Sequence, residues 1–186
     1  VVSISPLIPR DQPVIWRGPL RSGAITQFLA DVQWGDLDYL VADLPPGTGD
    51  EVLTAAQRMK PQLALVVTTP QEVSLSDCRR AVNMAGKLDI PHTAIVENMS
   101  GLKCPHCGEV IDIFKNSGGM FTAKKEGLNL LGSLPFEPDV VSAGDMGSMS
   151  LLDNPKRLIT QEFNKIVDKI VQLTESGAAS VPDAKK

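Results

Sequence analysis

The stretch LALVVTTPQEVSLSDCRRAVNMAGKLDIPHTAIV (Leu63–Val96) decides the fold class of this 186-residue chain. It begins and ends with short runs rich in apolar and β-branched residues, Leu63–Val67 and His92–Val96, as expected for strands buried on both faces. Between them, Ser74–Leu88 carries apolar residues at helical spacing, with Ser74 as a plausible helix cap. This order predicts a βαβ unit with two parallel strands.

The flanking sequence repeats this alternation of short strands and amphipathic helices. Further strands are expected at Tyr39–Ala42 and Asn129–Leu134, with a weaker one at Val1–Ser5. Helices are expected over four segments, Ala24–Gln33, Asp50–Met59, Gly118–Glu126 and Lys156–Leu173. We therefore predict an α/β fold, a mostly parallel sheet flanked by helices, in one domain over residues 1–174, followed by a disordered tail over 175–186.

The composition excludes several classes of protein. Hydrophobic residues make up 42% of the chain and charged residues 22%, both ordinary for a globular protein. The formal net charge of −4 argues against a general nucleic-acid binder, and no apolar run approaches the roughly 20 residues that span a membrane. Three cysteines with one CxxC pair do not form a secreted disulfide framework, so we predict a cytoplasmic protein with reduced thiols.

A glycine-rich turn follows the expected strand Tyr39–Ala42, and it reads Asp43-Leu44-Pro45-Pro46-Gly47-Thr48-Gly49-Asp50. Asp43 at the end of a strand is placed like the aspartate that holds Mg²⁺ in nucleoside triphosphatases. The glycines would let backbone N–H groups approach a phosphate. The alternative is an ordinary strand-to-helix turn in which Asp50 caps the helix. On the pattern alone, both interpretations stand.

Two more motifs follow the strand His92–Val96. The carboxamide of Asn98 can read a purine edge, although asparagine is also common in simple turns. Cys104-Pro105-His106-Cys107-Gly108 has the spacing of a metal knuckle in a loop over residues 101–117. Its place in a loop rather than at a helix start disfavours a redox pair. Two thiolates are half of a tetrahedral site, so two copies of the chain would supply Cys₄, for Zn²⁺ or for a [4Fe–4S] cluster.

Five segments together resemble the Mrp-type (ApbC/Nbp) iron–sulfur carrier ATPases, deviant P-loop proteins related to MinD and ArsA. These segments are WRGP (Trp16–Pro19), DYLVADLPPGTGDEVLTAAQ (Asp38–Gln57), VVTTPQEVSLSDCRRAVNM (Val66–Met84), VENMSGLKCPHCGE (Val96–Glu109) and GSLPFEPDV (Gly132–Val140). The resemblance runs in order from about Pro13 to Pro155. The combination is specific, although each part alone is weak.

The resemblance implies a function and a set of site residues. Proteins of this family bind a labile [4Fe–4S] cluster, pass it to apoproteins, and bind and slowly hydrolyse ATP with Mg²⁺. Asp43 would lie near Mg²⁺ and the attacking water. The γ-phosphate would be sensed by Pro46, Gly47 and Thr48, and adenine would be contacted by Asn98, with Pro135, Phe136 and Glu137 lining the base pocket. Cys104 and Cys107 would hold the cluster between the two chains of a homodimer.

The chain departs from the family pattern in one respect, because no segment matches the phosphate loop GxxxxGK[ST]. We therefore expect the fold to be incomplete at its N-terminus, with a central strand missing and the open seam making the isolated chain marginally stable. We also expect this chain alone to lack ATPase activity, since that loop would supply the phosphate-binding amides, lysine and Mg²⁺ ligand.

Two other functional classes compete with the iron–sulfur carrier. One is a structural zinc-knuckle dimerisation module on a degenerate ATPase fold, which the missing phosphate loop favours. The other is a MinD-like partitioning ATPase, which should carry a basic, membrane-binding C-terminal helix. The last helix instead mixes basic and acidic residues, namely Lys156, Arg157, Lys165 and Lys169 with Asp153, Glu162 and Asp168.

Overall fold

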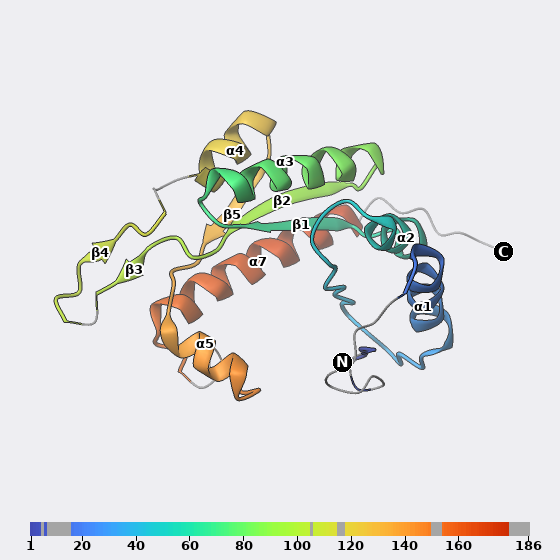
Figure 1. Ribbon diagram of the computed structural model, residues 1–186, viewed down its shortest axis with the longest axis horizontal. Coiled ribbons are helices and arrows are strands. Elements are labelled where there is room, and N and C mark those ends of the chain that lie inside the picture. The colour runs from blue at the N-terminus through green and yellow to red at the C-terminus, as the bar shows by residue number, and fades with distance from the viewer. Residues whose placement is uncertain (5, 7–15, 105, 115–117, 150–153, 179–186) are drawn as a thin grey trace. The chain divides into compact units, whose positions relative to one another are not determined.

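The computed structural model describes residues 1–4, 6, 16–104, 106–114, 118–149 and 154–178. It contains two compact units, residues 1–61 and 62–186. The boundary between them lies inside the single domain predicted for residues 1–174. Figure 1 shows the first unit in blue to cyan and the second in green to red.

The first unit is built on two helices, α1 (Gly18–Asp31) and α2 (Asp50–Met59). They are joined by an ion pair between Arg21 Nη1 and Glu51 Oε1 at 2.6 Å, which lowers the pKa of Glu51. The helix prediction for Asp50–Met59 is confirmed. The prediction of Asp50 as its cap is wrong, because Gly49 occupies the cap position and Asp50 lies in the first turn. There its negative charge faces the positive end of the helix dipole.

The segment between these helices does not form the strand expected at Tyr39–Ala42. Tyr39 is 45% exposed and Val41 is 88% exposed. A strand buried on both faces needs a hydrogen-bonded neighbour and covering layers, and the described part of the first unit contains no other strand. The described residues 1–4 also lack strand structure, so the weaker prediction at Val1–Ser5 is wrong there.

The second unit contains a three-stranded parallel sheet in the order β1-β2-β5, with bounds β1 (Leu63–Thr68), β2 (His92–Glu97) and β5 (Asn129–Ser133). The strand β1 pairs with β2 along its whole length, and α3 (Glu72–Lys87) connects the two. The predicted βαβ unit is therefore confirmed. Ser74 is not the cap of α3, because Gln71 takes that place. The Ser74 hydroxyl instead lies 2.9 Å from Thr68 Oγ1 and ties α3 to the end of β1.

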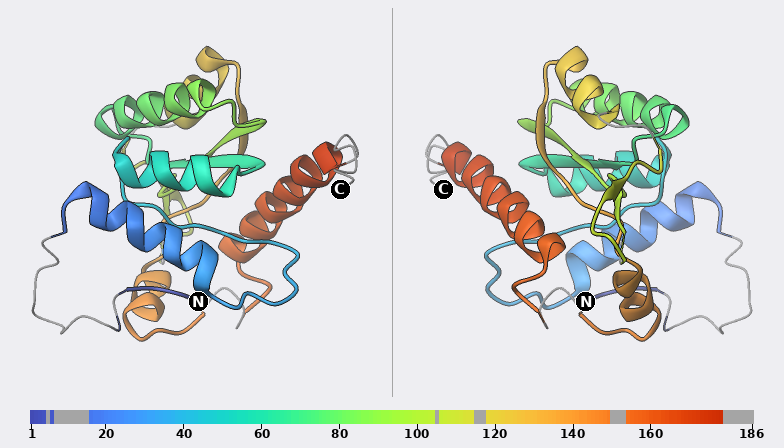
Figure 2. Two further views of the ribbon diagram at one scale, coloured as in Figure 1. Left: turned by 90° about the vertical axis from the view of Figure 1, so that its right-hand side faces the viewer. Right: turned by 90° about the vertical axis from the view of Figure 1, so that its left-hand side faces the viewer.

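Helices cover both faces of this sheet, as Figures 1 and 2 show. On one face lie α3 and α4 (Gly118–Glu126), over a core of Cys78, Val82, Ile95, Ala123 and the flanking Val66, Leu128 and Leu130. On the other lies α7 (Leu158–Ala178), over Ala94, Val96, Leu131, Ile166 and the flanking Leu63, Leu134, Ile170 and Leu173. Alternate residues of β2 thus face different helices, as the pleat of a strand requires.

Three smaller features complete the second unit. An antiparallel hairpin pairs β3 (Leu102–Lys103) with β4 (Val110–Ile111), and α5 (Pro138–Asp145) follows the sheet. The helix α7 runs to Ala178, so residues 175–178 of the predicted disordered tail are helical. The rest of the predicted tail, 179–186, lies outside the described residues. None of the described helices is long and apolar enough to cross a lipid bilayer.

Candidate functional site

The carboxyl ends of β2 and β5 bring two predicted binding segments next to each other. The backbone N–H of Leu134 donates to the Glu97 carbonyl at 2.8 Å, and the N–H of Ser100 donates to the Leu134 carbonyl at 2.9 Å. Asn98 and Pro135 therefore lie at the ends of hydrogen-bonded neighbouring strands. This edge of a parallel sheet is where α/β proteins usually bind ligands.

A strained turn follows β2 and positions Asn98. Its backbone N–H donates to the Thr68 carbonyl at 2.7 Å, and its side-chain Oδ1 accepts from the N–H of Met99 at 3.0 Å. Met99 has a φ of 57° and Gly101 a φ of 96°. A left-handed conformation is unfavourable for methionine but not for glycine. The turn is thus fixed by its hydrogen bonds, and it directs the chain away from the sheet into the cysteine-bearing hairpin.

The cysteine pair lies in a tight turn at the tip of the β3–β4 hairpin. The N–H of Cys104 donates to the Glu109 carbonyl at 2.8 Å, and the N–H of Gly108 donates to the Cys104 carbonyl at 2.9 Å. The backbone N–H of Cys107, then that of His106, and a hydrogen bond with the Cys107 thiol lower the pKa of Cys104. Cys107 is exposed and Cys104 partly exposed. The turn therefore favours a thiolate at Cys104 and leaves both sulfur atoms within reach of a ligand.

A hollow of about 350 Å³ joins this turn to the segment that follows β5. Its lining includes Cys104 from the turn and Pro135, Phe136 and Glu137 from the predicted base pocket. The N–H of Phe136 donates to the Gly101 carbonyl at 2.8 Å, next to an isolated parallel bridge between Leu102 and Phe136. One predicted metal ligand and three predicted nucleotide contacts thus line the same hollow, whereas Asn98 lies outside its lining.

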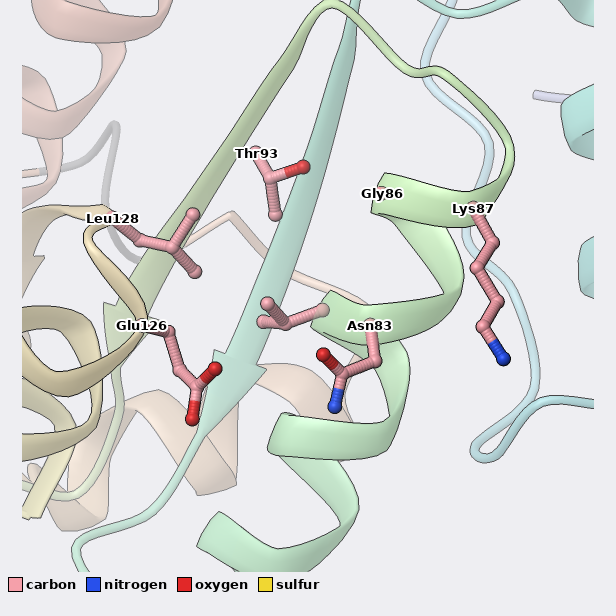
Figure 3. A pocket seen from close by; sticks show the side chains of 7 residues that line it. Asn83, Gly86, Lys87, Thr93, Glu126 and Leu128 are labelled. Carbon is pink, nitrogen blue, oxygen red and sulfur yellow. The ribbon is translucent and has the colours of Figure 1, made fainter.

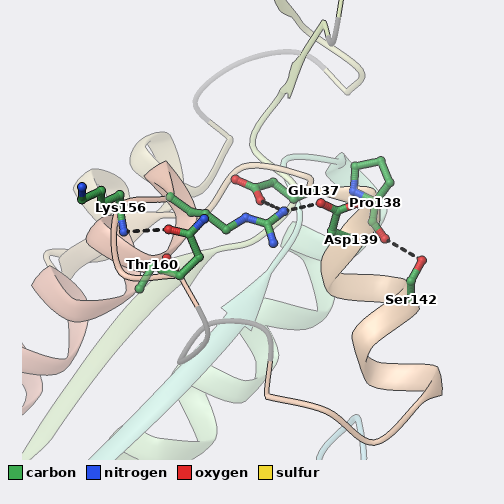
Figure 4. A network of polar contacts seen from close by, with 8 residues as sticks. Glu137, Pro138, Asp139, Ser142, Lys156 and Thr160 are labelled. Carbon is green, nitrogen blue, oxygen red and sulfur yellow. Dashed lines mark hydrogen bonds and ion pairs between the residues drawn. The ribbon is translucent and has the colours of Figure 1, made fainter.

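A small ionic network anchors one wall of this hollow (Figure 4). Arg157 Nη2 lies 2.9 Å from Glu137 Oε2 and 2.6 Å from Asp139 Oδ2. Arg157 precedes α7, and the two carboxylates flank the start of α5. Sequence reasoning did not assign Arg157 to this wall, because nothing local connects a residue before one helix to the start of another.

The predicted phosphate-side residues belong to the first unit. Asp43, Pro46, Gly47 and Thr48 are exposed in the segment between α1 and α2, and Gly47 has a φ of 99°. Asp43 does not end a strand, contrary to the expectation from sequence, because the preceding apolar run is unpaired. The roles of these four residues in phosphate and Mg²⁺ binding stay predictions.

A second and larger hollow, about 530 Å³, lies at the opposite end of the sheet (Figure 3). Asn83 and Lys87 from the end of α3, Thr93 from the start of β2, and Glu126 line it. Parallel sheets bind ligands beyond the carboxyl ends of their strands. Of its polar groups, Asn83 and Lys87 are exposed, and Thr93 and Glu126 are partly exposed. We therefore take the cysteine end of the sheet as the candidate functional site.

Among the residues that the structure describes, the cysteine pair is the candidate set of metal ligands. Within the described ranges, no group of three or more histidine, cysteine or acidic side chains could hold a metal ion. The third cysteine, Cys78, is 4% exposed in the core, and burial raises the pKa of its thiol. This confirms its predicted place in the core. Cys104 and Cys107 fit half of a four-thiolate site, which is what a soft metal or an iron–sulfur cluster requires.

Comparison with known proteins assigns the family. A model described as a ParA-type family, the NUBPL iron-transfer P-loop NTPases, matches residues 1–171. The chain belongs to the NUBPL iron-transfer P-loop NTPase family. An iron-sulfur cluster carrier protein of Pyrococcus horikoshii is 48% identical over 180 residues, which cover 95% of this NUBPL-type chain and 61% of the relative. The iron-sulfur cluster transfer protein NUBPL of Dictyostelium discoideum is 41% identical over 174 residues, covering 94% and 54%.

Solved structures agree with this assignment and place the fold. A nucleotide-binding protein of Archaeoglobus fulgidus in complex with ADP, with cobalt, is 40% identical, has a TM-score of 0.62, and is matched over 69% of this NUBPL-type chain and 53% of that one. The MinD cell division protein of Aquifex aeolicus has a TM-score of 0.60 at 18% identity, over 86% and 63%. The predicted α/β fold of the MinD-like P-loop type is confirmed. The chain therefore spans only part of these curated relatives, 61% of the Pyrococcus protein and 54% of the Dictyostelium protein.

Proposed function

We propose that this chain carries an iron–sulfur cluster as cargo, bound by Cys104 and Cys107, and delivers it to apoproteins in the cytoplasm. The observation that carries the proposal is the tip of the β3–β4 hairpin, where Cys104 is partly exposed and Cys107 is exposed, and where backbone N–H groups lower the pKa of Cys104. A cargo site must hold its cluster through few ligands and release it again. Two thiolates per chain at an exposed hairpin tip suit that requirement better than a closed structural site does.

The cluster lies between two copies of the chain in this proposal. Each copy supplies two thiolates, and a two-fold axis through the hairpin tips completes four cysteine ligands for a [4Fe–4S] cluster. Val110 and Ile111 on β4 are 65% and 48% exposed and offer apolar surface beside the pair. Burial of these side chains against a second copy would add stability that an isolated two-stranded hairpin lacks.

Nucleotide binding controls the cargo in the complete protein. Pro135, Phe136 and Glu137 would contact the base, with Asn98 at the neighbouring strand end, and Asp43 with Pro46, Gly47 and Thr48 would serve Mg²⁺ and the γ-phosphate. The hollow shared by Phe136 and Cys104 supports a link between the two ligands, because the N–H of Phe136 donates to the Gly101 carbonyl and a nucleotide at Phe136 would act on the cysteine hairpin through this bond. ATP hydrolysis would then change how firmly the hairpin holds its cargo.

Anaerobic reconstitution with iron and sulfide tests the carrier proposal. The expected product is a brown, oxygen-sensitive dimer that contains about two iron and two sulfide ions per chain. Cys104→Ala or Cys107→Ala should abolish the colour. Cys78→Ala is the matched control and should retain it, because Cys78 is buried in the core.

A structural zinc knuckle that only dimerises the chain is the second candidate. The exposed apolar side chains of β4 favour it, because they could form a dimer interface whether or not the cysteines carry a cluster. It predicts a colourless dimer whose tightly bound zinc persists through reconstitution. That result would refute the carrier proposal, whereas replacement of zinc by a labile cluster that passes to an apoprotein would refute the zinc knuckle.

A further inference from the structure

The segment that carries the cysteine pair begins after β2 and ends at the start of α4, and these two ends lie close together. It departs after β2 through Ser100, forms the β3–β4 hairpin, and returns at the start of α4, where Gly118 and Gly119 are the first two residues. We call its described residues, 101–104 and 106–114, the cysteine loop. The position of the two thiols depends on how firmly the two ends of this excursion are held together.

The side chain of Glu97 bonds both of these ends. Its Oε1 accepts a hydrogen bond from Ser100 Oγ at 2.7 Å, on the departing end. Its Oε2 accepts from the backbone N–H of Gly119 at 2.6 Å, on the returning end. The hydroxyl of Ser133 on β5 is a more distant donor to Oε1, at 3.4 Å. Glu97 is 2% exposed, so these bonds are shielded from water.

The partners of Glu97 are all hydrogen-bond donors. None of the ion pairs among the described residues includes it. Its oxygens are instead bonded by two hydroxyl groups and by the N-terminus of α4, whose first N–H groups have no partner within the helix.

Close packing of glycine makes this contact possible. A Cβ atom on Gly119 would lie 2.8 Å from Glu97 Oε2 and 3.1 Å from Glu97 Cβ. A Cβ atom on Gly118 would lie 2.5 Å from the carbonyl oxygen of Pro70. The start of α4 thus fits against the buried carboxylate and the connection between β1 and α3 only because both residues lack a side chain.

We propose that Glu97 is a positioning residue that clamps the base of the cysteine loop and so sets where Cys104 and Cys107 present the cargo. The inference rests on the proposed carrier function. Glu97 does not contact the cargo in this scheme. It acts through Ser100 and Gly119, which fix the two ends of the excursion to the same carboxylate.

Iron release from the whole chain, loaded anaerobically with iron and sulfide, tests the clamp. Ser100→Ala removes the bond to the departing end. Ser133→Ala is the matched control, because the Ser133 hydroxyl donates to the same oxygen of Glu97 but belongs to β5 and not to the cysteine loop. Glu97→Gln keeps the shape and leaves one acceptor oxygen instead of two. We expect Ser100→Ala and Glu97→Gln to lose iron to a chelator about tenfold faster than the wild type, and Ser133→Ala within about twofold.

Hydrogen exchange in the cargo-free chain gives a second readout. The amides of Ser100 and Phe136 bond to Leu134 and Gly101 at the base of the cysteine loop. They should exchange faster in Glu97→Gln, whereas amides within β2 should keep the wild-type rate. A general loss of stability would instead raise exchange throughout the sheet.

Each outcome decides between the two proposals. The clamp is overturned if Glu97→Gln and Ser100→Ala release iron at the wild-type rate, or if the amides of Ser100 and Phe136 exchange hydrogen at the wild-type rate in Glu97→Gln. Either result leaves the carrier function intact. If the wild type takes up no cluster, the carrier function fails, and the exchange rates alone decide the clamp. The clamp is also overturned if Ser133→Ala and Ser100→Ala accelerate iron release equally, because the bond from Ser100 at the departing end would then have no special role.

Discussion

Replacing Gly118 by alanine should destabilise the second unit, because the added methyl group has no space. A Cβ atom at this position would lie 2.5 Å from the carbonyl oxygen of Pro70 and 2.7 Å from Cδ1 of Leu75, whereas ordinary contacts begin at 3.4 Å. The Leu75 side chain can adjust by a rotation. The Pro70 carbonyl is part of the backbone, so the start of α4 must move instead.

The magnitude follows from two opposing terms. Over-packing of this kind costs about 1–3 kcal/mol. Alanine recovers up to about 1 kcal/mol over glycine in a helix, through its lower conformational entropy in the unfolded chain. We expect a net loss of about 1–2 kcal/mol. For a unit of this size that corresponds to a decrease in melting temperature of about 3–8 °C.

Urea unfolding can assign this loss to the correct unit. Both tryptophans, Trp16 and Trp34, belong to the first unit, so fluorescence follows that unit alone. Far-UV circular dichroism is dominated by the helices of the second. Gly118→Ala should lower the urea midpoint seen by circular dichroism without changing its slope. The fluorescence transition should stay at the wild-type midpoint.

Gly86→Ala is the matched control, because a Cβ atom there has nothing within 4 Å and the residue lies in the last turn of α3. It should stabilise the unit by up to about 1 kcal/mol. The packing argument would be refuted if Gly118→Ala unfolded at the wild-type urea concentration, or if Gly86→Ala lost as much stability as Gly118→Ala.

Three further predictions concern the core, the thiols and the ionic wall. Ile95 is 0% exposed, so Ile95→Ala should cost about 2–5 kcal/mol in the same urea assay, and a loss below 1 kcal/mol would contradict its central place in the core. Iodoacetamide should alkylate Cys104 well before Cys78, because the pKa of Cys104 is lowered by backbone N–H groups and that of Cys78 is raised by burial. Peptide mass spectrometry should show this preference growing as the pH falls, since the thiolate is the reactive form, and equal rates would refute it. Arg157→Ala should cost about 1 kcal/mol at low salt and less in 1 M salt, and a salt-independent loss would indicate packing rather than charge at Glu137.

The second unit could be predicted from sequence because its signals are local. The β1–α3–β2 unit follows from two apolar runs and one helical pattern between them, and the prediction of Gly118–Glu126 as a helix matches α4. Ala94, Ile95 and Val96 are almost fully buried, as expected for a central parallel strand with helices on both faces. In each case the residues that carry the pattern are the residues that become buried.

The run Tyr39–Ala42 shows where this reasoning stops. Its apolar pattern is as strong as that of β1, yet it forms no strand and Val41 is largely exposed. A strand forms only where a neighbouring strand accepts and donates its backbone hydrogen bonds, and the sequence of the run does not specify that neighbour. Asp43 was predicted to end a strand on the same local signal, and that part of the prediction is wrong for the same reason.

The candidate site was predictable in its parts but not in its assembly. Asn98 and the cysteine pair carry recognisable motifs. The hollow shared by Cys104 and Phe136 depends on backbone pairing between segments on either side of α4 and β5, which no local pattern specifies. Asn98 was predicted as a site residue and its neighbour Glu97 was not. A carboxylate that ends an apolar strand was the available signal, because burial obliges such a group to find several donors.

The place of β1 in the sheet has a practical consequence. Among the described strands it pairs only with β2, and its side chains Leu65 and Val67 are 39% and 60% exposed. The strand contains no proline and no charged residue, which are the usual protection of a sheet edge. Such an edge is a template for β-strands of other molecules. The purified chain should therefore aggregate at high protein concentration even below its unfolding temperature. The variant Val67→Lys should reduce light scattering at high concentration.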